Sequence, residues 1–206
     1  KKIRELFAAG TLGELHYIDG IRINLGLFQR DINVIWDLAP HDISIVQYIL
    51  QREPKSILAV GNSHTASGLE DVAYIHIDYG NNLLANFSMS WLSPVKTRRM
   101  IFSGSKKMIV YDDLDQTNII KIFDKGIELR KEEKDELYSL VSGYRSGDMV
   151  APAIKSTEAL SIEAEHFVEC IQSKKEPITN GYMGLKVVQL LEASNQSIKQ
   201  NRTIIF

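Results

Sequence analysis

The stretch VIWDLAPHDISIVQYIL, residues 34–50, carries three titratable side chains near the start of an otherwise apolar segment. Asp37 and His41 are four residues apart, so they share one face if the first turn is helical. A histidine near neutrality can remove the proton of a substrate hydroxyl, and an adjacent carboxylate can orient it and stabilise the imidazolium. These residue types at this spacing are compatible with a general base, His41, with Asp37 as its acidic partner.

Other interpretations of the same residues remain open. Asp37 could be the helix N-cap, accepting from the backbone N–H of Ala39, with Pro40 in a first turn that needs no donor. Ala39 precedes a proline, which leaves the start of the helix open by a residue or two. His41 could be a buried histidine with satisfied hydrogen bonds. Asp37, His41 and Asp42 could be metal ligands, but the further ligands lack a recognisable arrangement, so we predict no metal.

Composition narrows the class of protein. The 206 residues are 44% hydrophobic and 24% charged, which is typical of a globular domain. The net charge is −2 and the charges are interspersed, which excludes a phosphate-binding stripe and hence a nucleic-acid partner. No apolar run reaches the ~20 residues of a membrane span, and no signal peptide opens the chain, so we expect a cytoplasmic protein without a membrane partner. The single cysteine, Cys170, is predicted to be a buried reduced thiol.

The segment before the titratable stretch alternates in polarity. In GELHYIDGIRINLG, residues 13–26, apolar and polar side chains occupy opposite faces of an expected strand. One face holds Leu15, Tyr17, Ile21, Ile23 and Leu25, and the other holds His16, Arg22 and Asn24. We expect the apolar face to be buried and the polar face to be accessible.

The rest of the chain predicts an α+β fold. Residues 71–92 form two alternating runs joined by YGNN, and residues 98–113 turn at Gly104 and Ser105, so both read as hairpins. Residues 117–131 are expected to add another strand pair. Short turns cannot make parallel crossovers, so the sheet should be mainly antiparallel. Residues 157–175 and 181–200 have helical periodicity, and we expect the helices to pack on one face of the sheet.

The sequence contains no Gly-x-Gly-x-x-Gly, no P-loop and no Cys-x-x-Cys. Nothing in it is expected to cradle a pyrophosphate. The chain opens with KKIRELFAAG, which reads as an amphipathic helix from its first residues, so we expect a piece of a longer protein.

Three segments in order resemble one family, the C-terminal domain of the glucose-fructose oxidoreductase, inositol dehydrogenase and MocA oxidoreductases. KIRELFAAGTLGELHYIDG is similar to the segment after that family's dinucleotide-binding domain, and WDLAPHDISIVQYIL is similar to its Asp-x-x-x-His helix. EALSIEAEHFVECIQSKKEPITNGYMGLKVVQLLEASNQSI resembles its paired closing helices. The chain departs from the family where it has Leu38, Ala39 and Pro40 in place of a frequent glycine, Ser44 in place of a frequent aspartate, and Asp42 as an extra acid.

The resemblance implies a function. Residues 1–206 would be a single substrate-binding and oligomerisation domain, and the N-terminal Rossmann domain that binds NAD or NADP would be missing from this chain. His41 would be the general base as hydride leaves the same carbon, and Asp37 would hold the sugar or orient His41. The whole enzyme would oxidise a ring hydroxyl of a sugar, inositol or nucleotide sugar, while this part alone would be inactive. The alternative is a non-catalytic sugar-binding or oligomerisation module.

Substrate contacts are less defined. Arg22 and Asn24 could bind hydroxyls or a phosphate, or could lie on a solvated strand face. Trp36 could form a cleft wall or belong to the core. Tyr144 and Arg145, in a region without clean periodicity, could close over a nucleotide-sugar diphosphate.

Assembly follows from the family as well, whose open sheet face often packs against another subunit. Phe87, Met89 and Trp91 could line that face or could face the helices. We expect a homodimer or homotetramer formed through the sheet face.

Overall fold

The computed structural model describes residues 1–26, 28–129, 142–154 and 158–206. Four helices and eleven strands follow one another along these ranges. The helices are α1 (Lys2–Ala8), α2 (Val34–Leu50), α3 (Ala159–Ser173) and α4 (Gly181–Gln200). The strands are β1 (Leu15–Leu25), β2 (Ser56–Asn62), β3 (Val72–Asp78), β4 (Leu84–Ser90), β5 (Leu92–Gly104), β6 (Met108–Asp112), β7 (Ile120–Phe123), β8 (Gly126–Leu129), β9 (Ser142–Arg145), β10 (Met149–Val150) and β11 (Ile204–Ile205).

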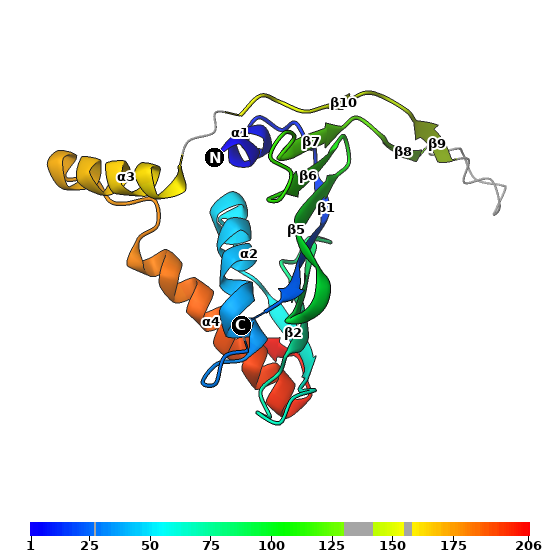
Figure 1. Cartoon of the computed structure of the whole chain (residues 1–206). Coiled ribbons are helices and arrows are strands. Elements are labelled where there is room, and N and C mark those ends of the chain that lie inside the picture. Colours follow the sequence, from blue (N-terminus) through cyan, green and yellow to red (C-terminus); the bar gives the residue numbers. More distant parts are fainter. Residues whose placement is uncertain (27, 130–141, 155–157) are drawn as a thin grey trace.

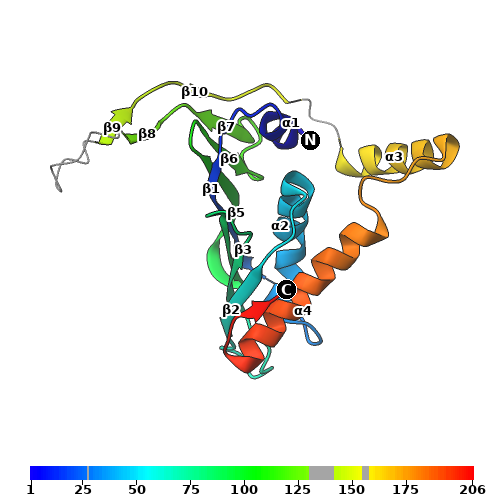
Figure 2. The same ribbon diagram turned by 180° about the vertical axis from the view of Figure 1, so that it is seen from behind.

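Nine of these strands form one sheet in the order β10-β7-β6-β5-β1-β4-β3-β2-β11. All neighbours are antiparallel except β1 and β4, which run parallel because α2, β2 and β3 intervene between them. This confirms the expected α+β class with a mainly antiparallel sheet. In Figures 1 and 2, α2 and α4 lie on one side of the sheet and leave its other face open.

Both predicted hairpins are present. The β3–β4 turn places Gly80, Asn81 and Asn82 at positive φ, a conformation that glycine and asparagine adopt more readily than other residues. The β5–β6 hairpin turns next to Gly104, whose added Cβ would lie 2.2 Å from the carbonyl oxygen of Leu12. The strand pair expected within residues 117–131 is wrong, because β7 joins the main sheet beside β6, whereas β8 pairs with β9 in a separate two-stranded sheet.

The core fills the space between the sheet and its covering helices. Its largest fully buried side chains come from α2, from the facing side of β1 to β5 and from the connections beside these strands, and include Ile35, Ile43, Phe87, Trp91 and Phe102. Phe87, Met89 and Trp91 therefore face the helices, which decides between the two positions that the sequence allowed. Cys170 is buried and unpaired, as expected.

The face assignment for β1 is wrong beyond Leu15. Ile18, Gly20 and Arg22 are buried against the helices, whereas Tyr17 and Ile21 are exposed on the open face. The pairing of β1 with β5 shifts register between Leu15 and Tyr17, and one irregular residue moves every later side chain to the opposite face. An acidic partner on α2 for Arg22 makes this burial possible.

Candidate active site

The helix that carries Asp37 and His41 begins at a fixed cap. Asn33 is the N-cap of α2 and its side-chain oxygen accepts from the backbone N–H of Trp36 at 3.2 Å. The Asn33 amide also donates to Glu70 at 2.7 Å and to Asn195 at 3.0 Å, which ties the cap to the β2–β3 loop and to α4. Asp37 is therefore inside the helix, and the alternative that makes it the N-cap is wrong. Pro40 is helical too, past the first turn.

Asp37 is held by the sheet beneath it. Its Oδ2 accepts from the indole Nε1–H of Trp91 at 2.8 Å, and Trp91 itself is 1% exposed. Gly26 makes room for the indole, because a Cβ there would lie 2.5 Å from Trp91 Cδ1. The edge of Phe28 also packs on this ring, with centroids 5.6 Å apart. The half-buried carboxylate of Asp37 is thus held in position by Trp91.

Asp42, the acid that the family pattern does not call for, makes an ion pair inside the protein. Its Oδ1 accepts from Arg22 Nη2 at 2.7 Å and from Nε at 3.1 Å, and the two side chains are 9% and 3% exposed. Gly20 leaves space at this point, since an added Cβ would meet Phe87 at 2.7 Å and Asp42 Oδ2 at 3.7 Å. The charge of Arg22 is therefore neutralised by Asp42 and is not available to bind a ligand.

His41 lies between these two acids along α2 and is exposed, so it is not a satisfied core histidine. Partial burial lowers the pKa of His41 below its ordinary value of 6.5, and the positive charges of Arg22 and Arg98 lower it further. The carboxylates of Asp42 and Asp37 oppose this shift in pKa without cancelling it. The imidazole is therefore neutral at pH 7, which is the form that can accept a proton.

The sequence did not single out two residues that lie close to this group, Arg98 and Tyr111. Arg98 is the register partner of Arg22 across the β1–β5 ladder, and Tyr111 is the partner of Met100 across β5–β6. Burial raises the pKa of Tyr111, so its phenol stays protonated and donates to Asp113 at 2.9 Å. The RR dipeptide at 98–99 was a signal, because alternation on a strand sends one of two consecutive arginines to the helix side.

The remaining predicted substrate contacts are spread over the molecule. Asn24 lies two residues beyond Arg22 on the same face of β1 and is half-buried. Trp36 lines a hollow beside the Asn33 cap. It is five residues from His41, which is roughly 140° around the helix. Arg145 on β9 pairs with Asp124, at the end of the molecule that Figure 1 shows far from α2. Tyr144 pairs with Ile127 in the same small sheet, and its side chain lies outside the described residues.

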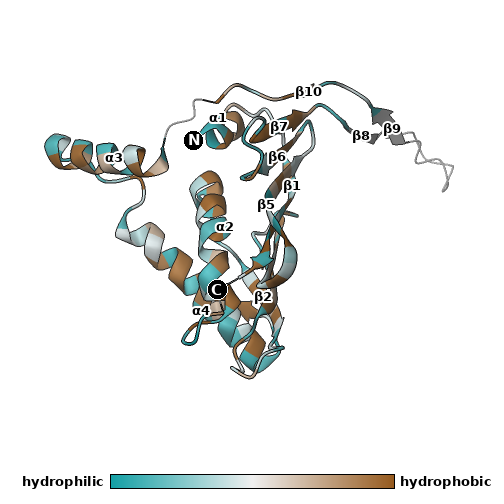
Figure 3. Cartoon of the chain, in the orientation of Figure 1, coloured by the Kyte–Doolittle hydropathy of each residue, from teal (hydrophilic) through white to brown (hydrophobic). Residues whose placement is uncertain are grey.

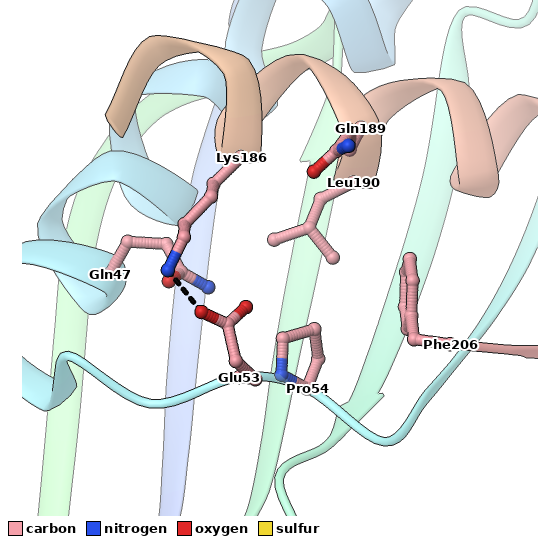
Figure 4. A pocket seen from close by; sticks show the side chains of 7 residues that line it. All are labelled: Gln47, Glu53, Pro54, Lys186, Gln189, Leu190 and Phe206. Carbon is pink, nitrogen blue, oxygen red and sulfur yellow. Dashed lines mark hydrogen bonds and ion pairs between the residues drawn. The ribbon is translucent and has the colours of Figure 1, made fainter. Parts of the chain in front are cut away.

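Two hollows in the described part of the chain are lined by residues other than His41. One, of about 320 Å³, lies where the C-terminal half of α2 meets α4, and Gln47, Lys186 and Phe206 line it (Figure 4). An ion pair between Lys186 and Glu53 crosses this hollow (Figure 4). The other, of about 480 Å³, lies beside the Asn33 cap. No cluster of three potential metal ligands occurs within the described ranges, and no helix there is long and apolar enough to cross a membrane.

The chain combines an open, mainly antiparallel sheet with an Asp-x-x-x-His helix on its covered face. The sequence model of the GFO/IDH/MocA C-terminal domain matches residues 1–110, more than half of the chain, and the chain belongs to this family. No curated protein matches the sequence.

Solved structures share the fold at low identity. UDP-N-acetylglucosamine 3-dehydrogenase from Acidithiobacillus ferrooxidans is similar at 20% identity and a TM-score of 0.74 over 95% of this chain and 57% of that one. Aldose-aldose oxidoreductase from Caulobacter crescentus, complexed with glycerol, is similar at 18% identity and a TM-score of 0.77, over 99% of this chain and 59% of that one. An oxidoreductase from Agrobacterium radiobacter, in complex with NAD+, L-tartaric acid and magnesium, is similar at 17% identity and a TM-score of 0.69, over 99% of this chain and 60% of that one. The chain thus spans under two thirds of the length of these proteins.

Proposed function

We propose that this chain is the substrate-binding and catalytic C-terminal part of an NAD- or NADP-dependent oxidoreductase. In this proposal the whole protein oxidises a ring hydroxyl of a sugar, inositol or nucleotide sugar. The observation that carries it is that His41 is exposed on α2, one turn beyond Asp37, whose Oδ2 accepts from the indole N–H of Trp91 at 2.8 Å. Membership of the family, and a fold shared with dehydrogenases of sugars and nucleotide sugars, support the substrate class.

The reaction divides between this chain and a cofactor. The substrate C–H bond breaks with its electron pair, the O–H proton is removed, and a C=O bond forms. A bound nicotinamide would supply the acceptor for the hydride. His41 accepts the hydroxyl proton on a ring nitrogen, and the carboxylates of Asp37 and Asp42 offset the imidazolium charge that results. In this proposal Asp37, whose carboxylate accepts a hydrogen bond from Trp91, accepts another from a second substrate hydroxyl.

The residues of this chain do not fit a dinucleotide cradle, since the sequence has no glycine-rich turn between a strand and a helix. We therefore assign cofactor binding to a further N-terminal domain of the kind that the family carries. Residues 1–206 would then be one domain of a larger enzyme and inactive alone. The purified chain should accordingly bind NAD and NADP far more weakly than the full-length protein, as measured by calorimetry.

Assembly through the open sheet face is part of the same proposal. Tyr17, Ile21, Leu58, Tyr74 and Leu84 are exposed on that face, across four neighbouring strands. Contiguous exposed apolar side chains of this kind mark interaction sites. This surface also supports the second candidate, a non-catalytic oligomerisation module, and the enzymatic assay separates the two.

The test is nicotinamide reduction by the full-length protein, supplied with free sugars, inositols and nucleotide sugars. Removing a general base lowers the rate about 10²- to 10⁴-fold, so His41→Asn should lose turnover while circular dichroism and cofactor binding stay unchanged. His16→Asn, which alters another exposed histidine, is the matched control. Equal turnover in the two variants would remove His41 from the mechanism, and cofactor binding without turnover on any of these substrates would favour the oligomerisation module.

A further inference from the structure

Two arginines lie side by side on the covered face of the sheet, and they differ in how their charge is used. Arg22 on β1 and Arg98 on β5 are directly opposed in the antiparallel register, so their side chains point to the same face. The guanidinium of Arg22 is buried and contacts Asp42 at 2.7 Å. That of Arg98 is 37% exposed and, among the residues that the structure describes, reaches only Asp113, at 3.5 Å.

The partner of Arg98 is also shared. Asp113 accepts a shorter bond, 2.9 Å, from the phenol of Tyr111. Arg99, the next residue, points to the open face and makes two bonds of 2.8 and 3.1 Å with Asp112. Of these three arginines, Arg98 has the longest and least complete ion pair, so its planar donors are the ones available to a ligand.

The available charge lies close to the proposed base. Arg98 lies opposite Arg22, whose guanidinium contacts Asp42, the residue next to His41 on α2. The charge of Arg98 is also among those that act on the His41 imidazole. A ligand group that reaches Arg98 from the exposed side of α2 is therefore within electrostatic reach of the imidazole.

We propose that the substrate is a polyhydroxylated compound bearing an oxyanion, a carboxylate or a phosphate, and that Arg98 binds this group while His41 faces the hydroxyl to be oxidised. The inference rests on the function proposed above. It adds a consequence for the base: a bound anion offsets the positive charge of Arg98, so His41 becomes a stronger proton acceptor once substrate is present. A neutral sugar would add no negative charge beside Arg98.

Binding can be measured on this chain without any cofactor. The imidazole signals of His41 are followed by NMR across pH, with and without D-gluconate, D-glucitol, D-glucose 6-phosphate or D-glucose. The first two differ in a carboxylate and the last two in a phosphate, so the pairs distinguish the two sources of negative charge. At least one anion should bind and raise the pKa of His41, whereas its neutral counterpart should not.

The variants Arg98→Gln and Arg99→Gln form a matched pair on adjacent residues. Loss of a charge-assisted contact should weaken binding of the anion ~10- to 100-fold in Arg98→Gln and leave it unchanged in Arg99→Gln. Equal binding of charged and neutral compounds, or equal binding by Arg98→Gln and the wild type, would overturn the proposal.

The full-length enzyme separates this inference from the proposed function. Turnover of neutral sugars that depends on His41 and is unchanged in Arg98→Gln would refute the oxyanion and keep the dehydrogenase. Anion binding that requires Arg98, in a protein without any His41-dependent turnover, would support the oxyanion site and refute the dehydrogenase.

Discussion

The two faces of β1 reverse the usual relation between polarity and burial. Arg22, a charged residue, is 7% exposed against the helices, while its apolar neighbours Ile21 and Leu25 are 38% and 70% exposed on the open face. The comparison teaches that the partners on each side of the sheet decide which side chains of a strand face the helices and which face the open side. On the covered side the partner is Asp42, and on the open side we propose that it is another copy of the chain.

Each face therefore depends on a group outside the strand. A buried guanidinium is tolerated only when an opposite charge and good hydrogen bonds compensate its desolvation, and three contacts from Asp42 do so here. An exposed apolar stripe needs cover of comparable extent. Changes that remove either partner test the comparison directly.

The largest effect is expected from Asp42→Ala. It leaves the charge of Arg22 buried without a counter-ion, which should lower the free energy of unfolding by about 3–5 kcal/mol, measured by urea denaturation. Asp112→Ala breaks the more exposed pair with Arg99 and should cost about 1 kcal/mol or less. The double variant Arg22→Met, Asp42→Leu should recover most of the loss. If Asp42→Ala and Asp112→Ala lower the free energy of unfolding by similar amounts, then the burial of Arg22 does not depend on its ion pair with Asp42.

On the open face, Ile21→Lys places a charge within the exposed apolar stripe. If a second subunit covers it, association should weaken by about 2 kcal/mol or more, the range of an interface hot spot, while the fold persists. Light scattering over a concentration series measures the loss. Leu114→Lys, in the loop between β6 and β7, changes an equally exposed leucine and should not alter assembly. A wild-type protein that stays monomeric at high concentration would contradict the proposed interface.

Local periodicity was sufficient for much of the fold. The existence of α2, the hairpin at YGNN and the hairpin at Gly104 follow from alternation, apolar spacing and turn residues, all of which are read within a few positions of the sequence. The start of α2 was left open by a residue or two. The partner of β8 could not be read in this way, because its ladder is with β9, more than ten residues further along the chain.

The site was predictable only in part, for the same reason. Asp37 and His41 stand out by spacing within one helix. Arg22 was found as a polar residue, but its burial depends on Asp42, twenty residues away, and the N-cap role of Asn33 depends on Glu70 and Asn195 for its setting. Arg98 was not singled out, since only the register of β5 against β1 brings it beside Arg22.

A smaller loss of stability is expected when the hydrogen bond from Trp91 to Asp37 is removed. Trp91→Phe keeps an aromatic ring in the core but removes the indole donor, so a half-buried carboxylate loses a hydrogen bond at a cost of about 1–2 kcal/mol. Trp36→Phe, at the rim of a hollow, is the matched control. The free energy of unfolding of both variants is measured in urea. If Trp36→Phe costs as much as Trp91→Phe, the bond to Asp37 does not contribute to stability.

The smallest effect is a pH dependence at His41. Its pKa is lower in the folded state than its ordinary value of 6.5, so as the pH falls through 6.5 the unfolded chain binds a proton before the folded protein does. The unfolded state then holds more protons, and stability decreases with falling pH until the folded pKa is passed. Above pH 6.5 this contribution is constant.

His41→Gln removes the proton-binding group, so its free energy of unfolding should change less than that of the wild type between pH 7 and 5.5. Ser44→Ala, which changes an exposed residue three positions further along α2 and removes no titratable group, should retain the wild-type slope. Urea denaturation at intervals across this range gives the slopes. A steeper loss in His41→Gln than in the wild type would reverse the sign of the pKa shift and remove the reason for treating His41 as neutral at pH 7. If the pH dependence attributed to His41 disappears in Arg98→Gln, then the charge of Arg98 is a main cause of the lowered pKa of His41.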